Sequence, residues 1–441
     1  MKVKSRIIVK RILSEDKFTI KYSLKLPHKI KKFFNGNTFF VKYKGEDITT
    51  VPESIRIIPL LSNVVPIAWA NNSDIIMQEV DKIFFSSLKK IRQSFKFIYP
   101  EINWEGNIVP GKVVNDTTKD YIDKDRSALL FTGGIDSVTS FYRHISEKPV
   151  LINVQGTDIS LNGYVKFKIV EDELTNFADY YTTDIKFIES NFRSFINNSI
   201  LNTFFEKQLL NFGWWAGIQH GLGLTGLCAP LAFKRKISKI YIASSFTKNF
   251  LKQWGSSPLI DNKVKFFFTG IKHDDYEFSR QDKLEYLSDY LLKKNYNLKL
   301  NVCASKGLEL NCSECEKCSR TMIGLLIAGI DPDRLGFDTK KFSFNSIIEK
   351  FEKGVFKVTD DELFMWEDIK KHLNFNKEPI VGNTIIPEYF LYWLKNTSFD
   401  KYKESYIRKK KRYKIVKSTI KYFPQLYNMI YKFYLRYIKN I

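Results

Sequence analysis

The order of apolar and polar positions divides the chain into three regions with different expected structures. Residues 1–119 hold short runs in which the two kinds alternate, such as Ser5–Ile12 and Asn37–Gly45, so this region is predicted to be rich in β-strands. One helical pattern, Ile75–Ile91, interrupts these strands. Residues 120–338 alternate apolar strand patterns with helical patterns, and residues 339–441 are expected to be mainly helical.

The middle region predicts an α/β fold, in which a parallel twisted sheet carries helices on both of its faces. Its expected strands are 128–131, 149–154, 185–189 and 239–244, and its expected helices are 137–145, 168–181 and a long one within 214–233. With 441 residues, of which 44% are hydrophobic, the chain can bury a sizeable core divided among two or three units.

The first strand of this sheet is predicted to run into the segment Thr132–Ser137, TGGIDS, and a helical pattern begins directly after it. Two glycines open backbone dihedral angles that other residues avoid, and they let N–H groups approach a ligand. A helix N-terminus adds further N–H groups and a positive dipole end, so the segment suits an anion such as phosphate. Asp136 would repel phosphate unless it holds a metal ion or orients another group. The alternative is a simple turn in which Ser137 caps the helix, and a Walker loop is excluded because no Gly-Lys-Ser/Thr follows.

Four of the five cysteines lie close together downstream, with the spacing C-x8-C-x2-C-x2-C. They are Cys303, Cys312, Cys315 and Cys318. Four thiolates satisfy tetrahedral zinc, so we expect a structural zinc site within 303–318. An iron-sulfur cluster uses the same ligands, and paired disulfides are a further alternative that a cytoplasmic chain would not normally keep.

The segment TGGIDS resembles the Ser-Gly-Gly-x-Asp-Ser loop of the PP-loop ATP pyrophosphatases, which have a HUP-like fold, with Thr132 in place of the first serine. In that superfamily the loop grips the pyrophosphate portion of ATP while a substrate attacks the α-phosphate to form an adenylate. The resemblance implies that ATP and Mg²⁺ are cofactors beside Zn²⁺. The nucleotide would be held by Thr132, Gly133, Gly134, Ile135, Asp136, Ser137, Gln155 and Ser244. The residues implied in catalysis are Asp136, Ser137, Lys283 and Arg280, the last two from a segment that occupies the place of the family's phosphate-binding lysine.

A PP-loop followed by four cysteines at this spacing is similar to the 7-cyano-7-deazaguanine synthases of queuosine biosynthesis and their relatives in anti-phage and other accessory gene clusters. The resemblance covers about Ser127–Gly329. Those enzymes adenylate the carboxylate of 7-carboxy-7-deazaguanine, let ammonia displace AMP to form an amide, and then activate again to form the nitrile. It implies an ATP-dependent carbon–nitrogen ligase that takes a small carboxylate or modified base, and ammonia or an amine as nitrogen donor.

The sequence departs from these synthases where they carry a Tyr-Pro-Asp-Cys-Arg type segment, because this chain has Ser245–Asp261 there. Polar segments that follow strands are expected to line the substrate site. The substrate contacts predicted from them are Asp158, Trp254, Ser256, Ser257, His273 and Asp274. For each of these a loop cap or a solvated side chain is the alternative. His220, on a largely apolar helix, is expected to satisfy a hydrogen bond in the core, and the alternative is that it faces the nucleotide.

The formal net charge is +22, and residues 401–441 hold thirteen Lys and Arg against one acid, Glu404. This basic tail, part of the helical region 339–441, is a candidate for contact with nucleic acid or an acidic membrane surface, and the alternative is a solvated extension. The start of the chain lacks the apolar core of a signal peptide, and no uninterrupted apolar stretch of 18 residues follows, so a cytoplasmic protein is expected. A homodimer is compatible with these features.

Two further functions compete with the ligase hypothesis. A sulfur transfer to RNA, which other PP-loop proteins perform, needs a free catalytic cysteine, and only Cys228 is left for that role. A zinc-ribbon nucleic-acid-binding protein with a decayed ATP loop is the alternative from another class. The intact Gly133, Gly134, Asp136 and Ser137 argue against it.

Overall fold

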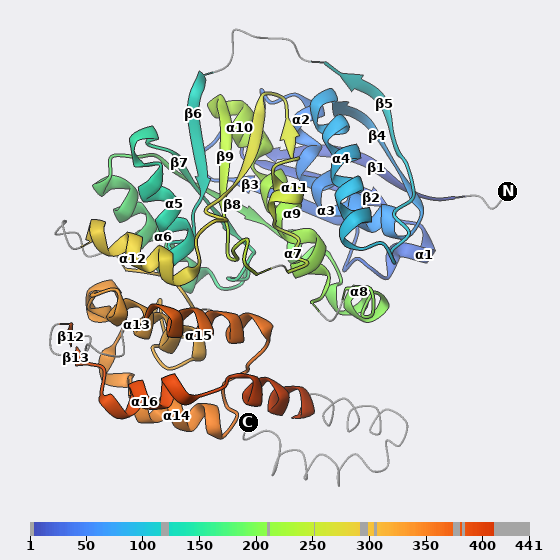
Figure 1. Cartoon of the computed structure of the whole chain (residues 1–441). Coiled ribbons are helices and arrows are strands. Elements are labelled where there is room, and N and C mark those ends of the chain that lie inside the picture. The colour runs from blue at the N-terminus through green and yellow to red at the C-terminus, as the bar shows by residue number, and fades with distance from the viewer. Residues whose placement is uncertain are drawn as a thin grey trace. The chain divides into compact units, whose positions relative to one another are not determined.

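The computed structural model describes residues 4–115, 123–209, 212–250, 252–291, 299–303, 307–373, 380–381 and 384–409. It divides the chain into two compact units, Met1–Phe278 and Ser279–Ile441 (Figure 1). Sequence analysis placed boundaries after residues 119 and 338 instead. The difference arises because strands and helices on either side of both expected boundaries pack together.

The first unit is built on a sheet of eleven strands in the order β10-β11-β9-β6-β7-β8-β3-β2-β1-β4-β5. Its five consecutive parallel strands are β6 (Asp123–Leu130), β7 (Val150–Gln155), β8 (Ile185–Ser190), β9 (Ile237–Ala243) and β11 (Thr269–Asp274). In space they run β11-β9-β6-β7-β8, so after β8 the chain returns to the other side of β6. Such a reversal of strand order leaves a crevice at the carboxyl ends of the two central strands, where ligands of open α/β sheets bind. Here those strands are β6 and β9.

The remaining strands extend this sheet at both edges. They are β1 (Ser5–Asp16), β2 (Thr19–Lys25), β3 (Thr38–Tyr43), β4 (Ser73–Asp81), β5 (Ile108–Val114) and β10 (Lys265–Phe266). The antiparallel pairing of β3 with β8 joins Val41 to Ser190 and Tyr43 to Ile188, so the N-terminal strands and the parallel strands form one sheet. The predicted β-rich N-terminal region is therefore present, but as part of a mixed sheet.

One predicted helix of this region is partly a strand. Residues 75–81 belong to β4, and the helix α4 (Lys82–Ile98) begins only after Asp81, whose carboxylate accepts a hydrogen bond from the Phe84 N–H at 2.7 Å. Apolar positions before Asp81 alternate in burial, as a strand requires, and those after it recur at helical spacing.

Helices cover both faces of the sheet, as predicted. The described helices of the first unit are α1 (His28–Lys31), α2 (Glu53–Arg56), α3 (Ile58–Ala70), α4, α5 (Ile135–Arg143), α6 (Tyr164–Tyr180), α7 (Phe192–Phe195), α8 (Asn198–Phe204), α9 (His220–Leu227), α10 (Ala229–Arg235) and α11 (Pro258–Asp261). Neighbouring residues of β11 show the two faces: Asp274 bonds to Ser140 of α5, and His273 bonds to Asp261 of α11. Successive side chains of a strand point to opposite faces, so α5 and α11 lie on different faces.

The second unit is mainly helical. It contains α12 (Arg280–Leu291), α13 (Glu316–Ile327), α14 (Phe344–Glu352), α15 (Asp360–His372) and α16 (Glu388–Asn396), with a short hairpin of β12 (Ile380–Val381) and β13 (Thr384–Ile385). Gln281 ties α12 to both neighbours, because its N–H donates to Asp368 of α15 at 3.2 Å and its amide donates to Gly324 of α13 at 3.0 Å. An aromatic core around Phe351 and Trp366 fills this unit.

Candidate functional site

The predicted phosphate-binding segment lies where strand order reverses. β6 ends at Leu130, the chain turns at Thr132–Gly134, and α5 begins at Ile135, so Ile135–Ser137 form the start of the helix. Gly133 has φ +73°, in the left-handed region that favours glycine, whereas Gly134 has φ −81° and ψ 164°, an extended conformation open to any residue. Only the first glycine is therefore required by backbone conformation.

Two hydroxyl groups hold this turn closed. The Ser137 hydroxyl donates to the Gly134 carbonyl at 3.1 Å and accepts from the Thr132 N–H at 3.3 Å. The Thr132 hydroxyl accepts from the Gly134 N–H at 3.3 Å. Gly134, and not Ser137, is the N-cap residue of α5, so the interpretation of Ser137 as an ordinary cap is wrong. Asp136 lies in the first turn of the helix and is half-buried.

Other predicted residues stand at the same carboxyl edge of the sheet. Gln155 ends β7, and Ser244 follows β9; both are buried. The Ser244 N–H donates to the Asp274 carbonyl at 2.8 Å, which holds the ends of β9 and β11 together. The fold thus brings the loop, Gln155 and Ser244 to neighbouring strand ends, as nucleotide binding would need.

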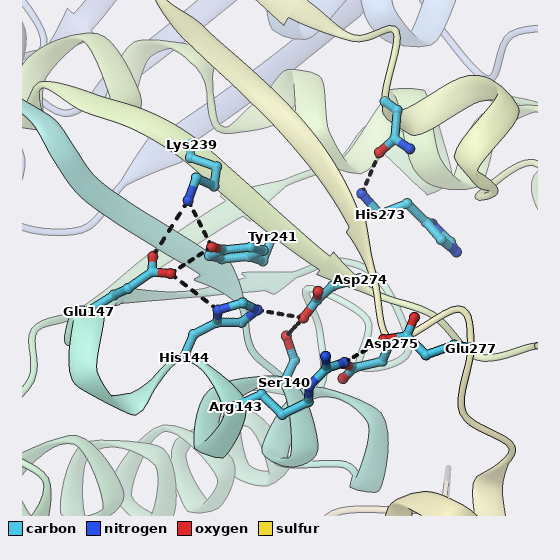
Figure 2. A network of polar contacts seen from close by, with 11 residues as sticks. Ser140, Arg143, His144, Glu147, Lys239, Tyr241, His273, Asp274, Asp275 and Glu277 are labelled. Atoms are coloured by element: carbon cyan, nitrogen blue, oxygen red, sulfur yellow. Dashed lines mark hydrogen bonds and ion pairs between the residues drawn. The ribbon is translucent and has the colours of Figure 1, made fainter.

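The side chain of Asp274, a predicted substrate contact, is engaged by other side chains of the protein. Its carboxylate accepts from the Ser140 hydroxyl at 2.5 Å and contacts the His144 ring nitrogen Nε2 at 3.0 Å (Figure 2). His144 also contacts Glu147 through Nδ1 at 3.2 Å, and its ring stacks on Tyr241. Although burial opposes the charged ring, these two carboxylates raise the pKa of His144. Burial likewise opposes the charged form of Asp274, but bonds from His144 and Ser140 lower its pKa. This network fastens α5 to the sheet.

Two other predicted substrate residues meet around an aspartate that sequence analysis did not single out. The buried carboxylate of Asp261 accepts from the Ser256 hydroxyl at 2.7 Å, and the same oxygen lies 2.8 Å from Nδ1 of His273. Ser257, the residue that precedes α11, has a buried hydroxyl without a partner among the described residues. The position of Asp261 depends on the fold, because its two partners come from the loop before α11 and from the strand β11.

Aromatic and basic side chains gather beside this group. The ring of His220 lies 4.9 Å from that of Trp215 and 5.5 Å from that of Trp254. The Arg193 guanidinium lies 4.3 Å from the Trp215 ring centroid, and Lys252 lies 4.6 Å from that of Trp254. Burial lowers the pKa of His220, which favours the neutral form of its ring. Of these residues the sequence predicted only Trp254 as a substrate contact, and its partners come from distant segments.

Asp158 differs from these residues because its side chain is 77% exposed and lies 3.9 Å from Arg193. The two residues predicted to neutralise phosphate, Lys283 and Arg280, lie in the second unit, on α12. The Lys283 side chain is buried. Their proximity to the loop of the first unit stays a prediction.

The four predicted metal ligands form one group in the second unit. The Sγ atoms of Cys303, Cys312, Cys315 and Cys318 all lie within 4.8 Å of one another. Two of them are 3.9 Å apart, close to the separation of about 3.8 Å that four ligands at 2.3 Å from a tetrahedral zinc ion would have. The four thiols could therefore hold a metal ion such as zinc, and none of them is in a disulfide.

Backbone N–H groups already point at these sulfur atoms. The N–H of Cys312 approaches Sγ of Cys303 at 3.3 Å, and the N–H of Cys315 approaches Sγ of Cys312 at the same distance. The contact with Cys303 raises the pKa of Cys315 to about 11, because negative charges on neighbouring sulfur atoms repel one another. A bound cation would reverse this effect and release protons from the thiols.

The remaining cysteine, Cys228, is fully buried, and burial raises the pKa of its thiol to about 12. A sulfur carrier needs an accessible thiolate, so the structure speaks against a sulfurtransferase that uses this residue. Residues 410–441 of the basic tail lie outside the described part of the chain. Within the described part, no helix combines the length and the apolar character that a membrane crossing requires.

The chain was compared with family models, with curated protein sequences and with solved structures, and none of them matches it.

Proposed function

We propose that this protein is an ATP pyrophosphatase that adenylates a carboxylate and then transfers the acyl group to a nitrogen nucleophile. One observation carries the proposal: a turn that needs glycine at Gly133 joins the central strand β6 to the N-terminus of α5, at the reversal of strand order. At that position a ligand could approach the backbone closely and meet the N–H groups of a helix N-terminus, in the crevice of an open α/β sheet. The resemblance of TGGIDS to the PP-loop supplies the choice of ATP.

In the proposed reaction the loop binds the β- and γ-phosphates of ATP, which leave as pyrophosphate, and no residue of the loop forms a covalent bond to the substrate. If it holds the β- and γ-phosphates, the α-phosphorus stays exposed, and a substrate carboxylate attacks it with release of pyrophosphate. The hydroxyl groups of Thr132 and Ser137 and the N-terminus of α5 would stabilise the growing negative charge. Asp136, in the first helical turn, is the residue that would hold Mg²⁺ near these phosphates.

The second unit would contribute in two ways. Lys283 and Arg280 are the cations expected to neutralise the leaving pyrophosphate. The four cysteines would hold a structural zinc ion, because a closed shell of four thiolates leaves no open coordination position for a substrate. The first carboxylate to test is 7-carboxy-7-deazaguanine, with ammonia as the nucleophile, because the similar synthases use them.

The proposal is tested by the nucleotide products. Purified protein incubated with ATP, Mg²⁺ and candidate carboxylates should form AMP and pyrophosphate, which chromatography of labelled ATP separates from ADP. Gly133→Ala should slow this reaction, because a left-handed conformation costs a residue with a Cβ about 1–2 kcal/mol and would distort the turn.

Gly270→Ala is the matched control. A Cβ at Gly270 would meet no atom within 4 Å, and its backbone angles are ordinary. This variant should keep the wild-type rate. Release of ADP in place of AMP, or equal rates in both variants, would contradict the proposal.

A further inference from the structure

A buried histidine next to the proposed nucleotide site keeps one ring nitrogen without a partner. His273 is 5% exposed, and its Nδ1 lies 2.8 Å from the Asp261 carboxylate. An ionised carboxylate only accepts hydrogen bonds, so Nδ1 carries the proton and donates it. Nε2, the other ring nitrogen, has no hydrogen-bond partner among the described residues. Buried polar atoms are nearly always paired in folded proteins, so this nitrogen calls for an explanation.

Asp261 fixes the ring in this state through several contacts. The carboxylate is itself fully buried, and Ser256 donates to the oxygen that faces His273. A Cβ at Gly221 would lie 2.0 Å from the other carboxylate oxygen, so the glycine allows the aspartate to sit against α9. The His273 backbone N–H donates to the side-chain oxygen of Asn262 at 2.7 Å. The ring is thus restrained at its backbone and at Nδ1, while Nε2 is not engaged.

Further unpaired polar atoms lie in neighbouring segments. Nδ1 of His220 and the hydroxyl of Ser257 are buried without a partner among the described residues. His220 follows a π-helical turn, Trp215–Gln219, and such turns are frequent at functional sites. In the described part of the chain, the group of three or more His, Cys, Asp or Glu residues that could hold a metal ion is that of the four cysteines.

The location relates this group to the proposed chemistry. His273 is the penultimate residue of β11, which pairs with β9, and β9 pairs with β6, whose end carries the phosphate loop. Two strand spacings are roughly 10 Å. A nitrogen nucleophile at His273 and a nucleotide at the loop would therefore occupy the same carboxyl edge of one sheet, with His273 on the face of α11 and the loop leading into α5 on the other face.

We infer that Nε2 of His273 accepts the proton of the nitrogen nucleophile, with Asp261 as the positioning residue. This inference rests on the proposed function. The nitrogen lone pair attacks the acyl carbon of the adenylate and a C–N bond forms; the C–O bond to the phosphate breaks, and AMP leaves with that electron pair. The proton released from nitrogen moves to Nε2 and later to water. The nucleophile is ammonia or a primary amine, because such a molecule has N–H groups that can donate to Nε2 of His273.

The decisive variant is His273→Asn, because the asparagine amide N–H can replace Nδ1–H toward Asp261 while no group replaces Nε2. ATP–pyrophosphate exchange measures adenylation without the nucleophile, and ammonia-dependent amide formation measures the second step. We expect the exchange to be unchanged and amide formation to fall by about a hundredfold or more. His28→Asn, at an exposed histidine, is the matched control and should change neither rate. Equal losses in both steps, or no loss, would overturn the inference.

A second measurement does not depend on the adenylation reaction. The measurement is the NMR spectrum of protein labelled with ¹⁵N-histidine. The sequence has five histidines, and the His273 signals are those that are absent from the spectrum of His273→Asn. The Nε2 signal should report a nitrogen without a proton and should shift with saturation on addition of ammonium chloride, but not of potassium chloride. If exchange with every carboxylate fails while this shift occurs, the proposed reaction is wrong and the amine site stands. If the shift is absent, the assignment of His273 is wrong.

Discussion

Replacing Cys315 by serine tests whether the four-cysteine group is a metal centre on which the second unit depends. Cys315 is the N-cap residue of α13, and its Sγ accepts from the Cys318 N–H. The same helix sends Ile323 and Leu326 into the core of that unit. Loss of the metal would therefore loosen a helix that belongs to the main packing of the unit.

The size of the effect follows from the geometry. Four Sγ atoms within 4.8 Å of one another match the shell of a single tetrahedral ion. Binding of structural zinc to such shells contributes about 10–16 kcal/mol at pH 7, whereas a whole domain is stable by about 5–15 kcal/mol. Removal of one ligand should thus cost most of the stability of the second unit, and the first unit should stay folded.

Metal content by mass spectrometry and hydrogen exchange by region measure the two expectations. Wild-type protein should carry one zinc ion per chain; Cys315→Ser should lose it, and amides of Glu316–Ile327 should exchange faster. Cys228→Ser is the control, because the thiol already donates to the Leu224 carbonyl and a hydroxyl inherits that partner. It should keep the metal at a cost of about 1 kcal/mol. Iron in the wild-type protein, or unchanged protection in Cys315→Ser, would refute the reasoning.

Three other outcomes are expected. His144→Gln should lower the free energy of unfolding by about 1.5–3 kcal/mol, because charge-assisted hydrogen bonds are lost. Since folding raises the pKa of His144, this loss should be complete below about pH 6.5 and should shrink as the pH rises through the folded pKa. Denaturant titrations at several pH values measure the loss, and a loss that does not depend on pH would contradict the prediction. Asp136→Asn should reduce AMP formation by about a hundredfold or more if that carboxylate holds Mg²⁺, and an unchanged dependence on Mg²⁺ concentration would exclude this role. Deletion of residues 408–441 should leave AMP formation intact and weaken salt-sensitive binding to nucleic acid or anionic vesicles; equal binding at low salt would make the tail a solvated extension.

Local sequence determined the features whose parts lie close together in the chain. The loop Thr132–Ser137 was predictable because a strand, two glycines and a helix follow one another directly. The cysteine group was predictable because two of its three spacings are tight turns, which bring the sulfur atoms together wherever the segment lies. The alternation of strands and helices after β6 was likewise visible, since each element carries its own hydrophobic period.

Tertiary structure decided what depends on pairing between distant segments. The pairing of β3 with β8 joins two predicted regions into one sheet. The sequence of neither strand specifies which other strand it pairs with. Asp274 and His273 are adjacent in sequence, yet one bonds to α5, 134 positions from its partner Ser140, and the other to Asp261 on the opposite face. Side-chain direction along a strand is fixed by its pleat, but what each side chain meets is fixed only when the helices pack. For that reason the sequence predicted a nucleotide loop and a metal site, and the fold alone brought Asp261 to His273.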